Sequence, residues 1–342
     1  MKRQDGERST PRCGTRAGAA ALGIAAAILA ALALAATGAG AQTAMQVPAG
    51  IPPYQPASGI SGSLSSIGSD TMNNLMTYWQ ESFRKHYPNV TIQVEGKGSS
   101  TAPPALIAGT AQLAPMSREM KATEIDAFEK KFGYKPSFIR TSLDALAVYV
   151  HKDNPIAGLT LPQLDAIFSK TRRGAFSEDL TSWSQLGLPA DWARPISLYG
   201  RNSASGTYGY FKEHALFKGD YKDTVKEQPG SASVVQGIEN DRFAIGYSGI
   251  GYRTAGVRAV PLAGKPGDPF VPADMEHVID GSYPLGRYLY IYYNQAPNKP
   301  LDPLVREFLR FVLSREGQEV VIKDGYLPLP EKVVQQESLK LQ

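Results

Sequence analysis

Hydrophobic residues recur at two different spacings along most of the chain. At 72–83 they fall three or four positions apart, as on one face of a helix. The residues of this face are Met72, Leu75, Met76, Trp79 and Phe83. At 90–94 apolar and polar residues alternate, as in a half-buried strand. Two uninterrupted apolar runs, ALAVYV at 145–150 and YLYIYY at 288–293, predict strands buried on both faces, the first of the kind found in parallel sheets.

Further predicted elements extend this alternation to the rest of the chain. Helices are expected at 102–108, 121–131, 161–169, 208–216 and 234–240, and strands at 196–199 and 243–247. A long last helix is expected from Asp302, a typical N-cap residue followed by Pro303, to about Val321. Because strands and helices alternate, the sequence predicts an α/β fold.

The two buried strands lie about 140 residues apart, which indicates two crossings of the chain between two lobes. We expect a discontinuous lobe 1, formed by residues 63–149 and 286–342, and a lobe 2 formed by residues 150–285. Residues 42–62 are rich in Pro, Gly and Ser and lack periodicity, so we expect them to form a flexible lead-in.

The first 41 residues have the features of a secretory leader. Five basic residues in the first 16 positions precede an uncharged apolar stretch at 17–36, and the AGA sequence at 39–41 is a small-x-small cleavage pattern. The predicted signal peptide therefore covers residues 1–41, with cleavage near Ala41. The apolar stretch is longer than usual, so a retained membrane anchor is the alternative. Cleavage would leave the product in the periplasm or outside the cell.

Charge and cysteine content change once this leader is set aside. The whole chain has 36 basic and 32 acidic residues, of which five and two lie in 1–41, so 31 and 30 are left. A mature charge of about +1 gives no basis for nucleic-acid binding. The only cysteine, Cys13, also lies in the leader. The mature chain is therefore expected to have no disulfide, thiol nucleophile or Cys metal ligand.

Four predicted helices begin shortly after small hydroxyl residues. These starts contain Ser69, Asp70 and Thr71; Ser99 and Ser100; Ser117 with Arg118; and Ser205, Gly206 and Thr207 with Arg201 upstream. A helix N-terminus has free N–H groups and a partial positive charge, and a hydroxyl beside it adds a further donor for an anion. A single Ser or Thr there is most simply a helix cap. Four such starts, two of them beside an arginine fork, favour a pocket for a small tetrahedral oxyanion.

Other chemistries find less support in the sequence. The four histidines, His86, His151, His214 and His277, are scattered without paired spacing, so we expect no metal site and no cofactor. Neither a GxxxxGK[ST] nor a GxGxxG motif is present, so no nucleotide loop is expected. A secreted phosphatase is an alternative, although no histidine base lies near Ser205 in the sequence.

Together, the helix starts resemble those of the periplasmic phosphate-binding proteins, the solute receptors of bacterial phosphate ABC transporters. The resemblance covers roughly residues 64–330. It rests on GSDT at 68–71, GSS at 98–100, SR at 117–118, RNSASGT at 201–207 and GYLP at 325–328. The R-x-x-x-SGT element is the most specific of these. The resemblance implies a periplasmic-binding-protein-like fold, in which two α/β lobes joined by two hinge strands close on phosphate in the cleft between them.

Position by position, the resemblance also implies roles for individual residues. Asp70 and Thr71 correspond to positions that offer backbone N–H groups, and Ser99 corresponds to a hydroxyl donor. The family's arginine and its donors at the helix start correspond to Arg201, Ser205, Gly206 and Thr207.

Two positions depart from the family pattern, and both concern a carboxylate. Some members have an aspartate at the place of Ser117, where it accepts the proton of phosphate, and some have one at the place of Ser203. An acceptor matters because phosphate near neutral pH keeps a proton and sulfate does not, so a carboxylate favours phosphate. We expect Asp144 to be the acceptor in this chain and Asp70 to be the second candidate. Alternatively, Asp144 only holds an arginine in place.

The sequence therefore predicts an exported, monomeric receptor that binds inorganic phosphate with high affinity and is not an enzyme. Hydrogen bonds from helix N-termini, hydroxyls and arginine would hold the anion, and an inner-membrane ABC-transporter permease would receive it. The phosphatase and a receptor for another oxyanion, such as sulfate, are the alternatives.

Overall fold

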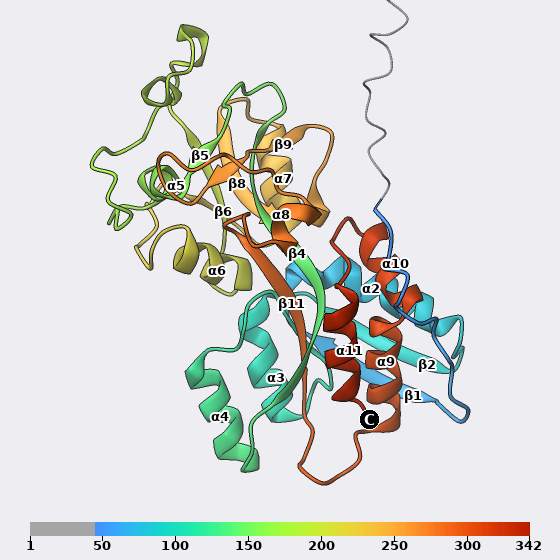
Figure 1. Cartoon of the computed structure of the whole chain (residues 1–342). Helices are drawn as coiled ribbons and strands as arrows, with labels where there is room; N and C mark the ends of the chain where they lie inside the picture. The colour runs from blue at the N-terminus through green and yellow to red at the C-terminus, as the bar shows by residue number, and fades with distance from the viewer. Residues whose placement is uncertain (1–44) are drawn as a thin grey trace, which may run out of the picture. The chain divides into compact units, whose positions relative to one another are not determined.

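The computed structural model describes residues 45–342 (Figure 1). The predicted signal peptide and its cleavage near Ala41 lie outside the described residues. Residues 46–342 pack as one compact unit. Within the described part of the chain, no helix has the length and apolar character needed to span a bilayer.

Strands and helices alternate along the chain, which confirms the predicted α/β class. The first elements are β1 (Gly62–Ile67), α2 (Asn73–Arg84), β2 (Val90–Glu95), α3 (Ala102–Ala108), β3 (Ala114–Met116), α4 (Ala122–Phe132) and β4 (Ser137–His151). The middle elements are β5 (Leu159–Thr160), α5 (Leu161–Phe168), β6 (Ser197–Arg201), α6 (Gly206–His214), β7 (Lys226–Gln228), α7 (Ser231–Glu239), β8 (Ala244–Gly249), β9 (Val257–Ala259), β10 (Leu262–Ala263) and α8 (Met275–Ile279). The last are β11 (Gly286–Tyr293), α9 (Pro303–Leu313), α10 (Arg315–Lys323) and α11 (Glu331–Leu339). Short 3₁₀ turns important for the site are η1 (Asp70–Met72), η2 (Ser99–Thr101) and η5 (Ile250–Tyr252).

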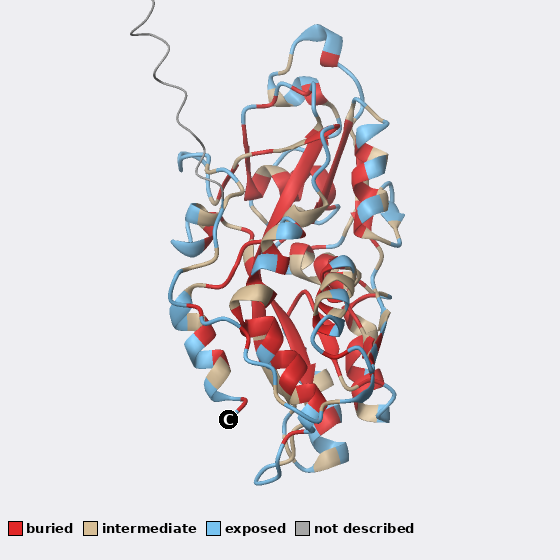
Figure 2. Cartoon of the chain, turned by 90° about the vertical axis from the view of Figure 1, so that its right-hand side faces the viewer, coloured by how far each residue is buried: buried red, intermediate tan, exposed pale blue. Residues whose placement is uncertain are grey.

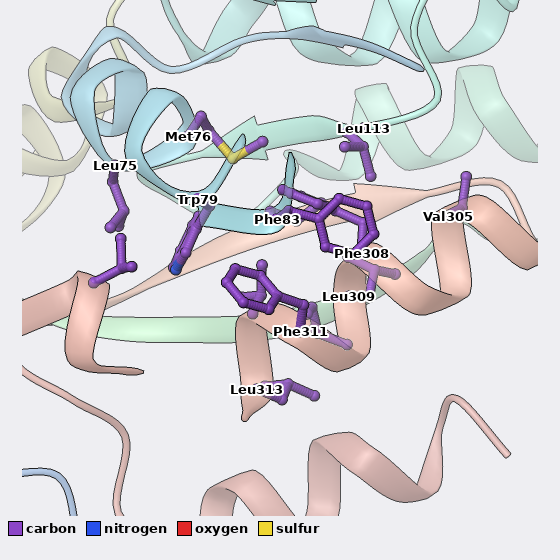
Figure 3. Close-up of a cluster of buried hydrophobic side chains, with 14 of the residues drawn as sticks. Leu75, Met76, Trp79, Phe83, Leu113, Val305, Phe308, Leu309, Phe311 and Leu313 are labelled. Atoms are coloured by element: carbon purple, nitrogen blue, oxygen red, sulfur yellow. The ribbon is translucent and has the colours of Figure 1, made fainter. Parts of the chain in front are cut away.

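The two largest of four hydrophobic clusters in residues 45–342 lie toward opposite ends of the long strand β4. The first packs α2 against α9, where the rings of Phe83 and Phe308 meet edge to face with centroids 5.4 Å apart (Figure 3). The second surrounds α5, α6 and β8, where the rings of Phe211 and Tyr247 stack 4.0 Å apart. We call the part with β1–β3, α2–α4 and α9–α11 the α2 side, and the part with β5–β10 and α5–α8 the α6 side.

The strand β4 joins the two sides through one sheet. Its first part, Ser137–Ala145, pairs with β11, and its second part, Leu146–His151, pairs with β8 and β9. The largest sheet in residues 45–342 has seven strands in the order β3-β11-β4-β8-β6-β7, with β9 also on β4. Figure 1 shows β4 and β11 running together between the two sides, and Figure 2 shows that these central strands are buried.

The pairing of β4 corrects one expectation. The ALAVYV run predicted a parallel strand, but β4 pairs antiparallel with β11, β8 and β9. The run is apolar because residues 145–150 are all fully buried. Burial on both faces, rather than strand direction, therefore accounts for the pattern.

Residues 45–61 are not a flexible lead-in. Ile51 and Tyr54 are buried in the core of the α2 side. The backbone N–H of Tyr54 donates to Glu316, and its hydroxyl donates to the buried Glu307 at 3.0 Å. The Pro and Gly residues remove regular periodicity here, but two large side chains are enough to anchor the segment.

The long last helix is also interrupted. Ser314 is extended, with φ −74° and ψ 170°, so α9 ends before it and α10 begins after it. Its hydroxyl accepts from the N–H of Gly317 at 3.2 Å and caps α10. A Ser followed by an acidic first turn is a helix start, and here it outweighs the continuous apolar spacing.

Candidate anion-binding site

Four hydroxyl residues from separate segments meet between the α2 side and the α6 side. The hydroxyls of Thr71 in η1 and Thr207 in α6 lie 2.8 Å apart. The hydroxyls of Ser99 in η2 and Ser117 after β3 lie 3.2 Å apart, and Ser99 also accepts from the N–H of Ser117 at 3.0 Å. All four residues are buried. The structure thus brings together residues that the sequence places up to 136 positions apart.

The N-terminus of α6 points into this group. Ser205 is its N-cap, and its hydroxyl accepts from the N–H groups of Thr207 and Tyr208. A Cβ on Gly206 would lie 2.3 Å from the hydroxyl of Ser99 and 2.7 Å from that of Ser117. Glycine is therefore required for the helix start to come this close to the hydroxyls of the α2 side.

A backbone hydrogen bond joins η2 to the loop that precedes α6. The N–H of Ser100 donates to the carbonyl of Ala204 at 3.0 Å. Gly98 has φ 109°, and a Cβ there would lie 2.5 Å from the same carbonyl oxygen. The GSS sequence therefore needs its glycine for both conformation and close approach.

Arg201 lies at the end of β6 and is 1% exposed. Its Nη1 donates to the hydroxyl of Ser231 at 2.7 Å, and its Nη2 donates to the carbonyl of Pro229 and forms an ion pair with Asp70 at 3.1 Å. Burial lowers the pKa of Arg201, and the neighbouring Asp70 carboxylate acts in the opposite direction. The arginine is thus held on its Nη edge.

Two polar atoms in these segments are buried without a protein partner, namely Nε of Arg201 and the hydroxyl of Ser69. A buried donor that lacks an acceptor costs free energy and calls for an explanation. Both belong to segments that the sequence assigns to an anion pocket, and an oxyanion supplies acceptors of the kind both atoms lack.

Asp144 and Arg287 form a fully buried pair across β4 and β11, where they are direct neighbours in register. Nε and Nη2 of Arg287 donate to one oxygen of Asp144 at 2.9 and 2.7 Å, and the N–H of Ile250 donates to the other. Arg287 also donates to the carbonyl of Ser117 and to the hydroxyl of Thr207, at 2.9 and 3.0 Å. These contacts support the alternative role of Asp144, which is to hold an arginine in place.

Arg287 is the site residue that sequence reasoning missed. It lies at the start of the GRYLYIYY strand, where a charge in an otherwise buried aromatic run is unusual. That position alone was a signal, but its partner depends on the register between β4 and β11. Ser231, at the start of α7, was missed for a similar reason, because no arginine lies near it in the sequence.

Arg118 pairs mainly with a carboxylate rather than with the four clustered hydroxyl residues described above. Its guanidinium makes a double ion pair with Glu124, at 2.7 and 2.8 Å, and reaches the hydroxyl of Ser100 only at 3.4 Å. Its Glu124 partner also accepts from the N–H of Lys121 and so caps α4. Ser117 and Arg118 therefore follow β3 and do not form the first turn of α4, which begins at Ala122.

The GYLP segment at 325–328 connects the turn that contains Thr71 with the central strand β4. The hydroxyl of Tyr326 donates to the carbonyl of Thr71 at 2.8 Å. Leu327 pairs with Leu143 on β4 through two backbone hydrogen bonds of 2.9 and 3.1 Å. This segment therefore fixes η1 relative to the central strands.

Each arginine of the group has its charge balanced by a carboxylate. The pairs are Arg118 with Glu124, Arg201 with Asp70, and Arg287 with Asp144. An anion bound here would be held mainly by hydrogen-bond donors and helix N-termini, rather than by uncompensated positive charge. In residues 45–342, no group of three or more His, Cys, Asp or Glu side chains is placed to hold a metal ion.

Comparison with known proteins places this arrangement in a family. A family model described as "PBP superfamily domain" matches residues 53–316. The chain is 58% identical over 302 residues to a protein of Pseudomonas aeruginosa named "Phosphate-binding protein PstS", covering 88% of this chain and 94% of the relative. It is 29% identical over 286 residues to "Protein SphX" of Synechococcus elongatus, covering 82% and 81%.

A solved structure agrees with this assignment. It is titled as a putative phosphate ABC transporter substrate-binding protein with bound phosphate, from Clostridium perfringens. It covers 79% of this chain and all of that chain, with 27% identity and a TM-score of 0.67. The resemblance drawn from the motifs is confirmed, and the chain belongs to the PBP superfamily, in the family of the PstS phosphate-binding proteins.

Proposed function

We propose that this protein is an exported receptor that binds inorganic phosphate between its α2 and α6 sides and delivers it to an ABC-transporter permease. The observation that carries the proposal is the buried group of hydroxyls at the N-terminus of α6, together with the unpartnered buried Nε of Arg201. A tetrahedral oxyanion accepts hydrogen bonds from several directions at once, which suits donors converging from four segments.

The relatives support phosphate as the anion. The protein of Pseudomonas aeruginosa is named for phosphate binding, and the structure from Clostridium perfringens contains phosphate. Because these names describe binding and transport, we propose that the chain does not transform its ligand. We also propose that the α2 and α6 sides act as two lobes, with β4 and β11 as hinge strands, and that closure presents a surface to the permease.

The twelve residues proposed for the pocket differ in how directly they face it. Direct donors are Ser69, Thr71, Ser99, Ser117, Arg201, Gly206 and Thr207. Asp70, Ser100, Arg118, Asp144 and Ser205 act mainly by holding these donors in place, as their contacts support. We add Arg287 to the pocket, because it donates to Thr207 and to the carbonyl of Ser117.

The proton acceptor is a separate question from the donors. Both oxygens of Asp144 accept from Arg287 or from the N–H of Ile250. Asp70 accepts three contacts on one oxygen, Oδ2. Asp144 as the acceptor stays a prediction from the sequence, but its contacts favour a holding role. We therefore propose Oδ1 of Asp70, the more available oxygen, as the proton acceptor.

Replacing the central arginine tests the proposal. Arg201→Ala is expected to weaken phosphate binding about 100-fold or more, because the change removes a buried charged donor. Arg242→Ala is a matched control, since Arg242 is about half exposed and lies against Trp192. Calorimetry would measure both affinities, with circular dichroism to check the fold. Near-wild-type affinity in Arg201→Ala would contradict the proposed pocket, and phosphate release from a chromogenic ester would favour a phosphatase instead.

A further inference from the structure

The carboxylate of Asp70 crosses from the α2 side to the α6 side. Its Oδ2 accepts from the N–H of Ser231 at 2.8 Å and from the hydroxyl of Ser231 at 3.0 Å. The same oxygen lies 3.1 Å from Nη2 of Arg201. Ser231 is the first residue of α7, so the carboxylate meets a helix N-terminus, a hydroxyl and a guanidinium at one point.

Donors of this kind often bind a free anion, but here they bind the carboxylate of Asp70. A carboxylate at a helix N-terminus interacts favourably with the helix dipole, and the hydrogen bonds that Asp70 accepts from Ser231 are charge-assisted. Arg201 is 1% exposed and the side chain of Asp70 is 20% exposed, so water screens their interaction only weakly. The contact therefore contributes to holding the two sides together.

The contact leaves one buried donor of the arginine, Nε, without a protein partner. Asp70, Ser231 and the carbonyl of Pro229 all use the Nη atoms of Arg201, whereas Nε has no protein partner. Asp70 and a bound anion would thus engage different nitrogen atoms of one guanidinium. They cooperate, because the carboxylate orients the arginine that the anion needs.

Other contacts near Asp70 also join the α2 side to the α6 side. The hydroxyl of Tyr252, in η5, donates to the backbone carbonyl of Asp70 at 2.9 Å. The Thr71–Thr207 contact and the Ser100–Ala204 backbone hydrogen bond also join the α2 side to the chain around the start of α6. These other contacts join neutral groups, whereas the side chain of Asp70 forms an ion pair with Arg201.

We propose that Asp70 is a latch, a positioning residue that docks on Arg201 and the start of α7 when the two sides close. It stabilises the closed form before an anion binds, and it slows the release of the anion afterwards. Only the slower release of the anion rests on the proposed phosphate-binding function. Stabilisation of the closed form concerns the protein without ligand.

Measuring phosphate binding tests the slower release of the anion. Asp70→Asn is expected to weaken phosphate affinity about 10- to 100-fold, mainly through faster dissociation, because it replaces charge-assisted hydrogen bonds by weaker ones. Asp223→Asn is the matched control: it removes the same charge from an exposed pair with Lys170 and is expected to have no effect. Ser231→Ala is expected to weaken binding much less in the Asp70→Asn background than alone.

The distance between the two sides tests the stabilisation of the closed form without any phosphate. With Cys13 changed to serine the chain has no cysteine, so spin labels can be placed at Glu129→Cys on α4 and Glu213→Cys on α6, both exposed positions. We expect a substantial short-distance population in the ligand-free protein, and its loss in Asp70→Asn but not in Asp223→Asn.

The outcomes separate the two proposals. An unchanged distance distribution in Asp70→Asn would overturn the latch, and so would fully multiplicative effects of Asp70→Asn and Ser231→Ala on affinity. A wild-type protein that fails to bind phosphate, while its label distance still depends on Asp70, would overturn the proposed function and leave the latch standing.

Discussion

Buried arginine–carboxylate pairs organise the site at the scale of single residues. Each arginine forms an ion pair with a carboxylate from another helix, strand or turn, and that carboxylate fixes which nitrogen atoms of the guanidinium are left for other partners. Sequence reasoning identified Arg201, Arg118 and Asp144 from their positions beside hydroxyls or a buried strand. It could not identify their partners, because Arg287 meets Asp144 only through the register of two strands 143 residues apart.

Removing the charge of Asp144 tests the role of this pair. Asp144→Asn leaves Arg287 buried without its counter-ion, so we expect the free energy of unfolding to fall by about 3 kcal/mol. The contacts favour a holding role, and we therefore expect phosphate and sulfate affinities to weaken by the same factor. Calorimetry with both anions measures this. A narrowed preference for phosphate would instead show that Asp144 accepts the phosphate proton.

The start of α6 controls the site at the scale of single elements. Its helix N-terminus approaches the hydroxyls of the α2 side because two glycines allow close contact, Gly98 in the α2 side and Gly206 in α6 itself. The SGT sequence predicted this helix start correctly. The long last helix was predicted wrongly because the N-cap signal of Ser314 competes with continuous apolar spacing. The direction of β4 was predicted wrongly because a buried antiparallel strand has the same apolar pattern as a parallel one.

Two alanine substitutions in α6 separate the pocket from the helix. Gly206→Ala would place a Cβ 2.3 Å from the hydroxyl of Ser99, so we expect phosphate binding to fall about 100-fold or more through displacement of donors. Gly209→Ala, in the same helix, meets its nearest atom, in Arg118, at 3.6 Å. We expect it to bind phosphate normally and to gain up to about 1 kcal/mol in stability. Equal affinities of the two variants would show that the helix start does not face the anion.

At the scale of the whole molecule, two cores share one sheet, and the site lies where their elements meet. The α/β class, two long buried strands and the family were predictable from hydrophobic spacing and motifs. The anchoring of residues 45–61 was not, because it depends on the fit of Ile51 and Tyr54 into a core formed by the other end of the chain. Long-range packing of this kind leaves no local sequence signal.

One buried carboxylate couples this packing to pH. Burial raises the pKa of Asp324 to about 7, from 3.8, and its Oδ2 has no hydrogen-bond partner. The folded chain therefore holds a proton that the unfolded chain releases near pH 4. The stability from this group is complete below pH 4 and is lost as pH rises to about 7.

Chemical denaturation of the wild type and Asp324→Asn at several pH values tests this coupling. The variant lacks the ionisable group, so we expect it to gain stability relative to the wild type between pH 4 and pH 7, by at most about 4 kcal/mol at about 1.4 kcal/mol per pKa unit. Above pH 7 the difference should stay constant. A difference that does not change with pH would mean that Asp324 is ionised in the folded protein at all these values.

Calorimetric titration of the wild-type protein with phosphate, and then with sulfate, at neutral pH tests the central claim most directly. We expect one phosphate per chain, bound tightly, and much weaker binding of sulfate, which brings no proton for a carboxylate to accept. Absence of heat with phosphate, or equal affinity for sulfate, would contradict a phosphate receptor built on these donors.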